Sequence, residues 1–431
     1  MPTRARKRTD SVTTNGKHLV RRLLSLIDAS KLLNTTLNLD QLLPIILELT
    51  TKNLNADRGT IYLIDHTKQE LWSRVVKGKE LVEIRLPIGT GIAGNVAKTG
   101  KTINLKDAWK DKRFFSGVDM KSGFQTKTML CMAMKNRQGK IVGVFQVLNK
   151  RRGVFDREDE LFLKAFSDHV VLAIETAWLH QEILEKELVE KEIHIAASIQ
   201  QKLIPKELPR IPQYELDGIA LPSKTVGGDF YDVIPVKDGR FVIVVADVSG
   251  KGIPASLLVS TLHASLHAYI QMELSLSELV RKLNETVHRN TTPDRFITLF
   301  IGVLDPQDHT FSYVNAGHNF PLLIGKEREK MQMLESGGMP LGMFGAVEYQ
   351  TKSVELQDND VLVLYTDGVT EAMNKSLIEY GDERFQECLR KHILLSAPEL
   401  KAKVVTDVQR FTSGEPQSDD LTLMVVKRLP N

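Results

Sequence analysis

The feature that most constrains this chain is a long stretch without any helix breaker. Neither Gly nor Pro occurs between Asp156 and Ile204, and we predict one long helix over residues 158–203. Pro205 and two further prolines end it, because proline cannot continue a helix. The middle of the segment, QEILEKELVEKE, is highly charged and has only a narrow apolar stripe. Such a helix suits a linker or a two-stranded coiled coil rather than a domain core.

The predicted helix separates two parts of a chain of 431 residues, a length that allows two or three domains at roughly 100–200 residues each. We expect a basic flexible tail at 1–18, a first domain at 19–178, a linker helix at 179–205 and a second domain at 206–431. The basic tail fits either a tether to nucleic acid or membrane, or a solvated segment. The net charge of +3 is small for this length, so we expect no nucleic-acid partner.

Composition also bears on the cellular compartment. No apolar run of about 18 residues occurs, so we expect no spanning helix and no membrane partner. The first residues show no apolar core followed by a small-residue cleavage site, so we expect no secretory signal. The two cysteines, Cys131 and Cys388, cannot form a disulfide framework or a cysteine zinc site. These observations favour a cytoplasmic protein.

The part before the long helix mixes helices and strands. Hydrophobic periodicity predicts helices at 19–33 and 40–54 and strands at 60–64, 83–86, 129–134 and 141–148. The polar segment 136–140 makes the last two strands a hairpin candidate. The segment GTGIAGNVAKTG (89–100) is glycine-rich and opens a helix, an arrangement that offers backbone amides to an anion. Loops of this kind are common, so the signal is weak by itself.

The part after the long helix has strands that end in acidic residues. The apolar run FVIVVA leads directly into Asp247, and VLVLYT leads directly into Asp367. A third run, LTLMVV, is preceded by Asp419 and Asp420. Because the end of one antiparallel strand lies beside the start of the next, we expect these acids at one edge of a sheet. Asp229 follows two glycines, where the backbone can approach an ion closely.

Clustered carboxylates repel one another unless cations neutralise them. Hard divalent cations such as Mg²⁺ or Mn²⁺ prefer oxygen ligands. Two such ions, roughly 3.5–4 Å apart, can activate a water and stabilise the charge that develops on a phosphoryl group. The alternative is that each Asp is a turn or cap residue. Four acids at the ends of apolar runs favour the metal centre.

Five segments in this part resemble the SpoIIE/RsbU-like branch of the PPM protein phosphatases. The segments, in order along 195–428, are VGGDFYD, ADVSGKGIPASL, NAGHNFPLL, LYTDGVTEAMN and SDDLTLMVV. The resemblance implies an αββα sandwich that carries two Mn²⁺ or Mg²⁺ ions. It also implies a phosphoserine or phosphothreonine substrate on a protein, in this branch often a small anti-sigma-factor antagonist. The phosphate-binding arginine of eukaryotic PPM enzymes has no clear counterpart in this sequence.

The resemblance also assigns the ligands. It implies that Asp247 bridges both ions, that Asp367 and Asp420 complete one site, and that Asp229 and the backbone carbonyl of Val248 serve the other. The adjacent Asp419 would support the ligands without binding an ion itself.

Three histidines are further candidates. His263 and His267 are spaced as two metal ligands on a predicted helix, 254–289, but no HExxH glutamate accompanies them. Packing of that helix on a sheet is the favoured interpretation. His318, in NAGHNFP, is either a general acid or, as we favour, a loop-structuring residue.

The first domain resembles GAF domains, over residues 20–178. The carrying segments are IAGNVAKTGKTINLKDAWKDKRF, SGFQTKTMLCMAMKN and GVFQVLNK. The resemblance extends to the cyclic-nucleotide-binding subset, whose NKxnFx3DE pattern is matched at five positions: Asn149, Lys150, Phe155, Asp159 and Glu160. In that family the Lys and Asp form a structural ion pair. The whole chain is thus predicted to be an α+β protein, in which a GAF domain (an antiparallel sheet flanked by helices) is joined by a long helix to a PPM-type sandwich.

The same resemblance implies a GAF effector, cAMP or cGMP, contacted near Ile92, Ala93, Asp107, Ala108 and Thr126. Ala133-Met134 stands where the family usually has a proline-containing strand, which leaves the shape of the pocket open. A GAF domain that only dimerises is the alternative. We also expect a homodimer through this domain and the linker helix.

The resulting hypothesis is a metal-dependent serine/threonine phosphatase under GAF control. The alternative is a cyclic-nucleotide sensor whose phosphatase-like domain is a non-catalytic scaffold. A cyclic-nucleotide phosphodiesterase is not favoured, because it needs a histidine-rich HD-type site and no His-Asp dipeptide occurs.

Overall fold

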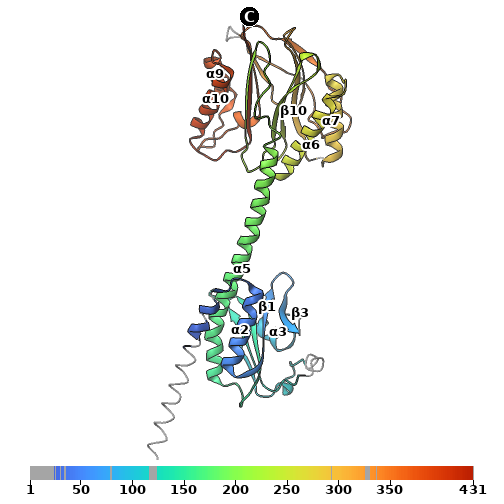
Figure 1. Ribbon diagram of the computed structural model, residues 1–431. Helices are drawn as coiled ribbons and strands as arrows, with labels where there is room; N and C mark the ends of the chain where they lie inside the picture. Colours follow the sequence, from blue (N-terminus) through green and yellow to red (C-terminus); the bar gives the residue numbers. More distant parts are fainter. Residues whose placement is uncertain are drawn as a thin grey trace, which may run out of the picture. The chain divides into compact units, whose positions relative to one another are not determined.

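The computed structural model describes residues 24, 26–29, 31–33, 35–77, 80–115, 124–292, 294–325, 331–335 and 337–430. The chain divides into two compact units, Met1–Leu188 and Val189–Asn431, which are described separately (Figure 1). The predicted tail at 1–18 lies outside the described residues, and the described positions from 24 to 33 are helical. Among the described helices, none is both long and apolar enough to cross a bilayer.

The first unit is built on an antiparallel sheet of six strands in the order β3-β2-β1-β6-β5-β4. The strands are β1 (Ala56–Asp65), β2 (Glu70–Lys77), β3 (Glu80–Pro87), β4 (Ile103–Leu105), β5 (Met129–Lys135) and β6 (Ile141–Lys150). The helices are α2 (Leu39–Leu54), α3 (Gly91–Thr99), the short η1 (Ala108–Lys110) and α5 (Arg157–Gln200). The predicted hairpin is therefore confirmed as the β5–β6 pair.

Helices cover both faces of this sheet. On one face, Ile46 of α2 and Phe166 of α5 pack against Phe145 of β6. On the other face, Val96 of α3 packs with Val144 of the same strand. Because β6 is buried on both faces, its sequence reads as a continuous apolar run. This arrangement confirms the predicted GAF-type fold of the first unit.

The second unit contains two antiparallel sheets of five strands each. The first has the order β14-β11-β10-β9-β8, with β8 (Asp229–Pro235), β9 (Phe241–Val248), β10 (Ile297–Asp305), β11 (Thr310–Ala316) and β14 (Lys352–Glu355). The second has the order β13-β12-β15-β16-β7, with β7 (Tyr214–Leu221), β12 (Leu322–Ile324), β13 (Met331–Met333), β15 (Val361–Tyr365) and β16 (Leu421–Arg428). The helices are α6 (Ile253–Ile270), α7 (Leu276–Asn290), α8 (Asp367–Thr370), α9 (Gly381–His392) and α10 (Ala397–Thr412), with the short η2 (Lys237–Gly239).

The two sheets face each other and helices cover their outer sides (Figure 1). Strand β9 shows the alternation that creates these layers: Val244 packs toward α6 and α7, whereas Val245 packs with Met424 of the second sheet. Helices α9 and α10 bury their apolar faces on the outer side of the second sheet. The predicted αββα sandwich is confirmed.

Local signals explain where the covering helices begin. Ser275 caps α7 and Ser396 caps α10, each with a glutamate three residues later that returns a hydrogen bond to the cap. The predicted helical block 254–289 is two helices, α6 and α7, because the polar segment around Ser275 ends one helix and caps the next.

Candidate metal centre between the two sheets

The first sheet contributes two aspartates that lie opposite each other. Asp229 begins β8 and Asp247 lies near the end of β9, and the two are directly paired across the antiparallel ladder. Tyr231 and Val245, two residues away on the same faces of these strands, belong to the core between the sheets. Side chains alternate along a strand, so both carboxylates point toward the second sheet.

The second sheet contributes the other two aspartates. Asp367 follows β15 and Asp420 precedes β16, and these strands are neighbours in that sheet. The prediction that the acids gather at one edge of a single sheet is therefore wrong. Strand β9 pairs with β8 and β10, whereas β15 pairs with β12 and β16, so the acids meet across the gap between two sheets.

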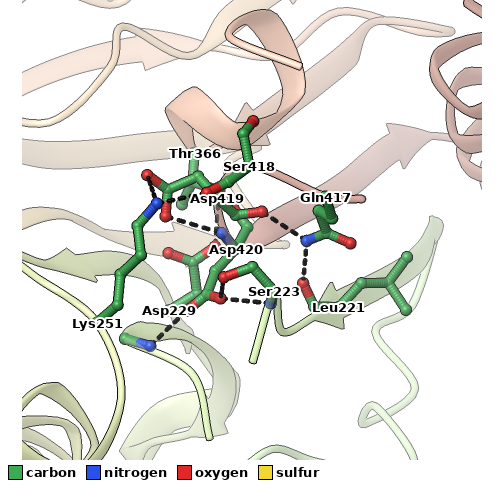
Figure 2. A network of polar contacts seen from close by, with 10 residues as sticks. Leu221, Ser223, Asp229, Lys251, Thr366, Gln417, Ser418, Asp419 and Asp420 are labelled. Carbon is green, nitrogen blue, oxygen red and sulfur yellow. Dashed lines mark hydrogen bonds and ion pairs between the residues drawn. The ribbon is translucent and has the colours of Figure 1, made fainter. Parts of the chain in front are cut away.

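Neighbouring polar groups hold two of these carboxylates in place (Figure 2). The Thr366 hydroxyl donates to Asp229 Oδ2 at 2.7 Å and accepts from the backbone N–H of Thr422 at 2.9 Å. Asp420 Oδ1 accepts from the backbone N–H and the hydroxyl of Ser223 at 2.6 and 2.8 Å, and its Oδ2 accepts from the Gly228 N–H. The carboxylates are thus oriented before any ligand binds.

Three glycines let the backbone approach this site. A Cβ on Gly227 would lie 2.9 Å from Asp420 Oδ2, and a Cβ on Gly368 would lie 1.9 Å from the Asp420 carbonyl oxygen. A Cβ on Gly228 would lie 3.1 Å from the Val248 carbonyl oxygen. The glycines that precede Asp229 and follow Asp367 therefore serve close packing around the acids.

Burial and mutual repulsion perturb the acids. Burial, and then the charge of Asp247, hold the pKa of Asp229 well above its usual range. Burial, and then Asp367 and Asp419, raise the pKa of Asp247 to about 7. The pKa of Asp367 is raised as well, first by burial and then by Asp419. These shifts reflect burial first and the neighbouring negative charges second.

The donor set fits hard divalent cations. All of the ligands expected from the sequence offer oxygen, which Mg²⁺ and Mn²⁺ prefer. Among the described residues, no three of these carboxylates have oxygens mutually within 4.8 Å.

Lys251 is a functional candidate that the sequence analysis missed. Its ammonium lies 2.9 Å from Asp419 Oδ2 and also donates to the Ser418 carbonyl (Figure 2). The ion pair keeps Asp419 on the Lys251 side of the site. The only sequence feature that could have indicated this role is that Lys251 is the one basic residue of the acid-containing segment ADVSGKGIPASL. Thr366 and Ser223 were also missed, because nothing in their local sequence marks them as partners of distant acids.

His318 is buried and committed to the structure of its loop. Its Nδ1 lies 2.9 Å from the Thr298 hydroxyl, and the Asn315 side chain bonds both its backbone N–H and its carbonyl. Burial lowers the pKa of His318 to about 4. At pH 7 the ring is therefore the neutral imidazole, which is a far weaker acid than the imidazolium. Together with the loop contacts, this favours the loop-structuring role over the general acid.

The five residues expected to contact a GAF effector fall on three segments. Ile92 and Ala93 are buried in the first turn of α3, and Ala108 and Thr126 are also buried. The Ala108 N–H donates to the backbone carbonyl of the residue after Thr126 at 2.8 Å, so these two segments are adjacent. Asp107 caps η1 through the Trp109 N–H. Residues 116–123, between these segments, lie outside the described part.

The ion pair expected from the NKxnFx3DE pattern is confirmed. The Lys150 ammonium donates to Asp159 Oδ2, and the Asp159 side chain is fully buried. Asp159 also accepts from the Asp156 backbone N–H at 3.0 Å. The pair ties the end of β6 to the first turn of α5, which is a structural role.

Comparisons with known proteins agree with both halves of this description. Residues 237–429 match the family model Stage II sporulation protein E (SpoIIE), and residues 38–174 match the GAF domain model. The SiaA-PP2C domain of Pseudomonas aeruginosa superposes with a TM-score of 0.51 at 20% identity, covering 56% of this chain and 98% of that domain. That likeness shows a shared fold.

Two curated relatives extend the comparison. A probable 3′,5′-cyclic phosphodiesterase, pde-5 of Caenorhabditis elegans, is 33% identical over 171 residues, which is 37% of this chain and 23% of that protein. Phosphoserine phosphatase RsbU of Bacillus subtilis (strain 168) is 30% identical over 241 residues, which is 56% of this chain and 71% of that protein. The chain therefore belongs to the SpoIIE/RsbU family of PPM-type phosphoserine phosphatases and carries a GAF domain ahead of its phosphatase domain.

Proposed function

We propose that the protein is a Mn²⁺- or Mg²⁺-dependent phosphatase that hydrolyses phosphoserine or phosphothreonine on a protein. The observation that carries this proposal is the meeting of four aspartates from two sheets, three of which have raised pKa values. Crowded carboxylates are unfavourable in the protein alone and become favourable once cations bind. A site held at this cost is expected to have a cationic ligand.

In this proposal Asp247, Asp367 and Asp420 would hold one ion, and Asp247, Asp229 and the Val248 carbonyl would hold the other. When bound, the ions would supply an activated water and stabilise negative charge on the phosphoryl group. The chain itself orients the ligands: Thr366 fixes Asp229, and Ser223 fixes Asp420. Removal of either supporting hydroxyl is expected to weaken metal affinity by about 10–100-fold.

The test is release of phosphate from a phosphoserine protein in the presence of Mn²⁺. Asp247→Ala and Asp367→Ala are each expected to abolish turnover. Asp308→Ala, an exposed acid in the turn between β10 and β11, is the matched control and is expected to retain it. Full activity in both site variants would refute the assignment. Absence of turnover in the unaltered protein would favour the non-catalytic scaffold.

For the substrate we propose a small phosphorylated anti-sigma-factor antagonist. The support is the resemblance to the SpoIIE/RsbU branch, together with the similarity to a named phosphoserine phosphatase. Competition between candidate phosphoproteins in one reaction would measure their relative kcat/KM. A preferred protein substrate should have a higher kcat/KM than free phosphoserine, because contacts beyond the phosphoryl group add binding energy that free phosphoserine lacks.

For the GAF domain we propose that cAMP or cGMP binds near Ile92, Ala93, Asp107, Ala108 and Thr126. The support is the NKxnFx3DE pattern with its ion pair in place, and the similarity to a probable cyclic phosphodiesterase. Titration calorimetry of the full chain with each nucleotide tests this proposal. No heat with either nucleotide at high protein concentration would favour a GAF domain that only dimerises.

Control of the phosphatase through α5 is supported by the contact at the end of that helix. The Gln200 side-chain amide donates to the Gly227 carbonyl at 2.6 Å, and its oxygen accepts from the Gly227 N–H at 3.2 Å. Gln200 is buried and Gly227 lies two residues before Asp229. Gln200→Ala is expected to change phosphatase activity and to remove its response to nucleotide. A normal response in this variant would exclude the route.

A homodimer through α5 is supported by apolar side chains that the single chain leaves exposed. Those in the second half of the helix are Leu179, Ile183, Leu184, Leu188, Val189, Ile195 and Ile199. Seven such residues on one solvated helix favour a parallel two-helix contact. Light scattering should give a dimer for the unaltered chain and a monomer for the double variant Leu184→Lys/Leu188→Lys. A monomeric unaltered chain would refute the proposal.

A further inference from the structure

A second cluster of metal-ligating side chains lies on the opposite face of the strand that carries Asp229. Asp232 is three residues further along β8, and its neighbour Phe230 belongs to the core under α6. Side chains alternate along a strand, so Asp232 faces α6 whereas Asp229 faces the second sheet. His263 and His267 lie one turn apart on α6 and meet Asp232 there.

The three side chains are close enough to share one ion. His267 Nε2 lies 2.9 Å from Asp232 Oδ2, and the two imidazole centroids are 4.3 Å apart. One ligand atom from each residue lies within 4.8 Å of the other two. Ligands about 2.1 Å from a tetrahedral Zn²⁺ stand roughly 3.4 Å apart, so small rotations of the histidines would suffice.

The surroundings favour a cation over simple packing. The other oxygen of Asp232 accepts from the Val233 N–H at 2.7 Å, which fixes the carboxylate. Phe230 packs edge-on against His263, with ring centroids 5.8 Å apart, and limits its rotation. Burial and the neighbouring His267 lower the pKa of His263, so its ring offers a lone pair at neutral pH. A shared ion would use a ring nitrogen from each histidine and one oxygen of Asp232.

We propose that Asp232, His263 and His267 form a transition-metal site of the Zn²⁺ type, separate from the carboxylate centre. Two imidazoles and one carboxylate are borderline ligands that suit Zn²⁺ and Co²⁺ rather than Mg²⁺. Asp232 is buried and the two histidines are partly exposed, which leaves a fourth position to water. The ion would tie α6 to β8, the strand that begins with Asp229.

The test uses the tag-free full chain, stripped of metal and titrated with Co²⁺ and Zn²⁺. The double variant Asp247→Asn/Asp367→Asn serves as background, because it weakens metal binding at the carboxylate centre. In that background we expect one Zn²⁺ per chain by metal analysis, and visible Co²⁺ bands that two nitrogen ligands intensify. Neither readout depends on phosphatase activity, so the outcome is separate from that of the proposed function.

His263→Gln and His267→Gln are each expected to raise the Zn²⁺ Kd by at least about tenfold, since loss of a ligand exceeds loss of its supporting contact. His66→Ala removes an exposed histidine elsewhere and should leave binding unchanged. Circular dichroism checks folding, and either histidine variant decides the matter if the other fails to fold. Asp232→Asn provides a third readout. Zn²⁺ affinity that is equal in the folded histidine variants and the background would overturn the site.

Discussion

The crowded acids should make the metal-free protein less stable as pH rises, and Asp247→Asn should remove much of that loss. Burial, followed by the charges of Asp367 and Asp419, raises the pKa of Asp247 from 3.8 to about 7. Asparagine has nearly the same shape and carries no charge. The variant therefore isolates the electrostatic cost of this one carboxylate.

The direction of this pH dependence follows from proton binding to Asp247. The folded protein holds a proton on Asp247 at pH values where the unfolded chain has lost it. Stability from this group is therefore fully present below about pH 4 and is lost as pH rises toward and through 7. Because the pKa rises from 3.8 to about 7, the free energy of unfolding should fall by about 4 kcal/mol at most. At pH 8 the free energy of unfolding of the variant should exceed that of the unaltered protein by up to this amount. Near pH 4 the two free energies should converge.

The assay is urea unfolding of the full chain in EDTA, followed by far-ultraviolet circular dichroism at several pH values. All three tryptophans, Trp72, Trp109 and Trp178, belong to the first unit. Their fluorescence reports that unit and should be the same in both proteins, which provides an internal control. Saturating Mn²⁺ should stabilise the unaltered protein far more than the variant. Parallel pH profiles for the two proteins would refute the reasoning.

Three further predictions concern contacts seen in the structure. Thr366→Val removes the hydroxyl that orients Asp229 and should weaken Mn²⁺ affinity about 10–100-fold, while Thr366→Ser should retain it; equal dissociation constants from calorimetry would contradict this. Asp419→Asn should cost only a few-fold in kcat/KM for a phosphoprotein, because this acid pairs with a lysine; loss as complete as in the ligand variants would make it a ligand. Lys150→Met strips the buried Asp159 of its cation and should destabilise the first unit by about 3–5 kcal/mol, measured by tryptophan fluorescence; an unchanged midpoint would contradict it.

Patterns confined to short segments predicted much of the fold. The apolar runs before Asp247 and Asp367 become strands β9 and β15, because both strands are buried on two faces and leave a continuous signal. The stretch free of Gly and Pro becomes α5, and the NKxnFx3DE spacing correctly predicted the Lys150–Asp159 pair. In each case the physical cause lies within a few turns or strands of sequence.

The contacts that organise the candidate site were not predictable in the same way. Which sheet a strand joins depends on pairings between distant segments, so the sequence did not show that Asp229 and Asp367 come from opposite sheets. Thr366 bonds to a carboxylate 137 positions away, and Ser223 to one 197 positions away. When the partner is so far away in the sequence, the residues around a threonine or serine do not indicate that its hydroxyl orients a carboxylate.

The backbone before Asp229 is bonded both by the end of α5 and by a proposed metal ligand. These shared contacts give a physical basis for the proposed control of the metal centre through α5. Gln200, at the end of α5, bonds the Gly227 backbone, while Asp420 accepts from the next N–H and leaves no room for a Cβ on Gly227. Movement of the helix end would therefore displace the backbone at 227–228, which leads into Asp229 and donates a hydrogen bond to Asp420. A signal that shifts α5 by a fraction of a turn would act on metal binding before it acted on substrate. In that case an effector should change the Mn²⁺ concentration needed for half-maximal activity more than it changes KM.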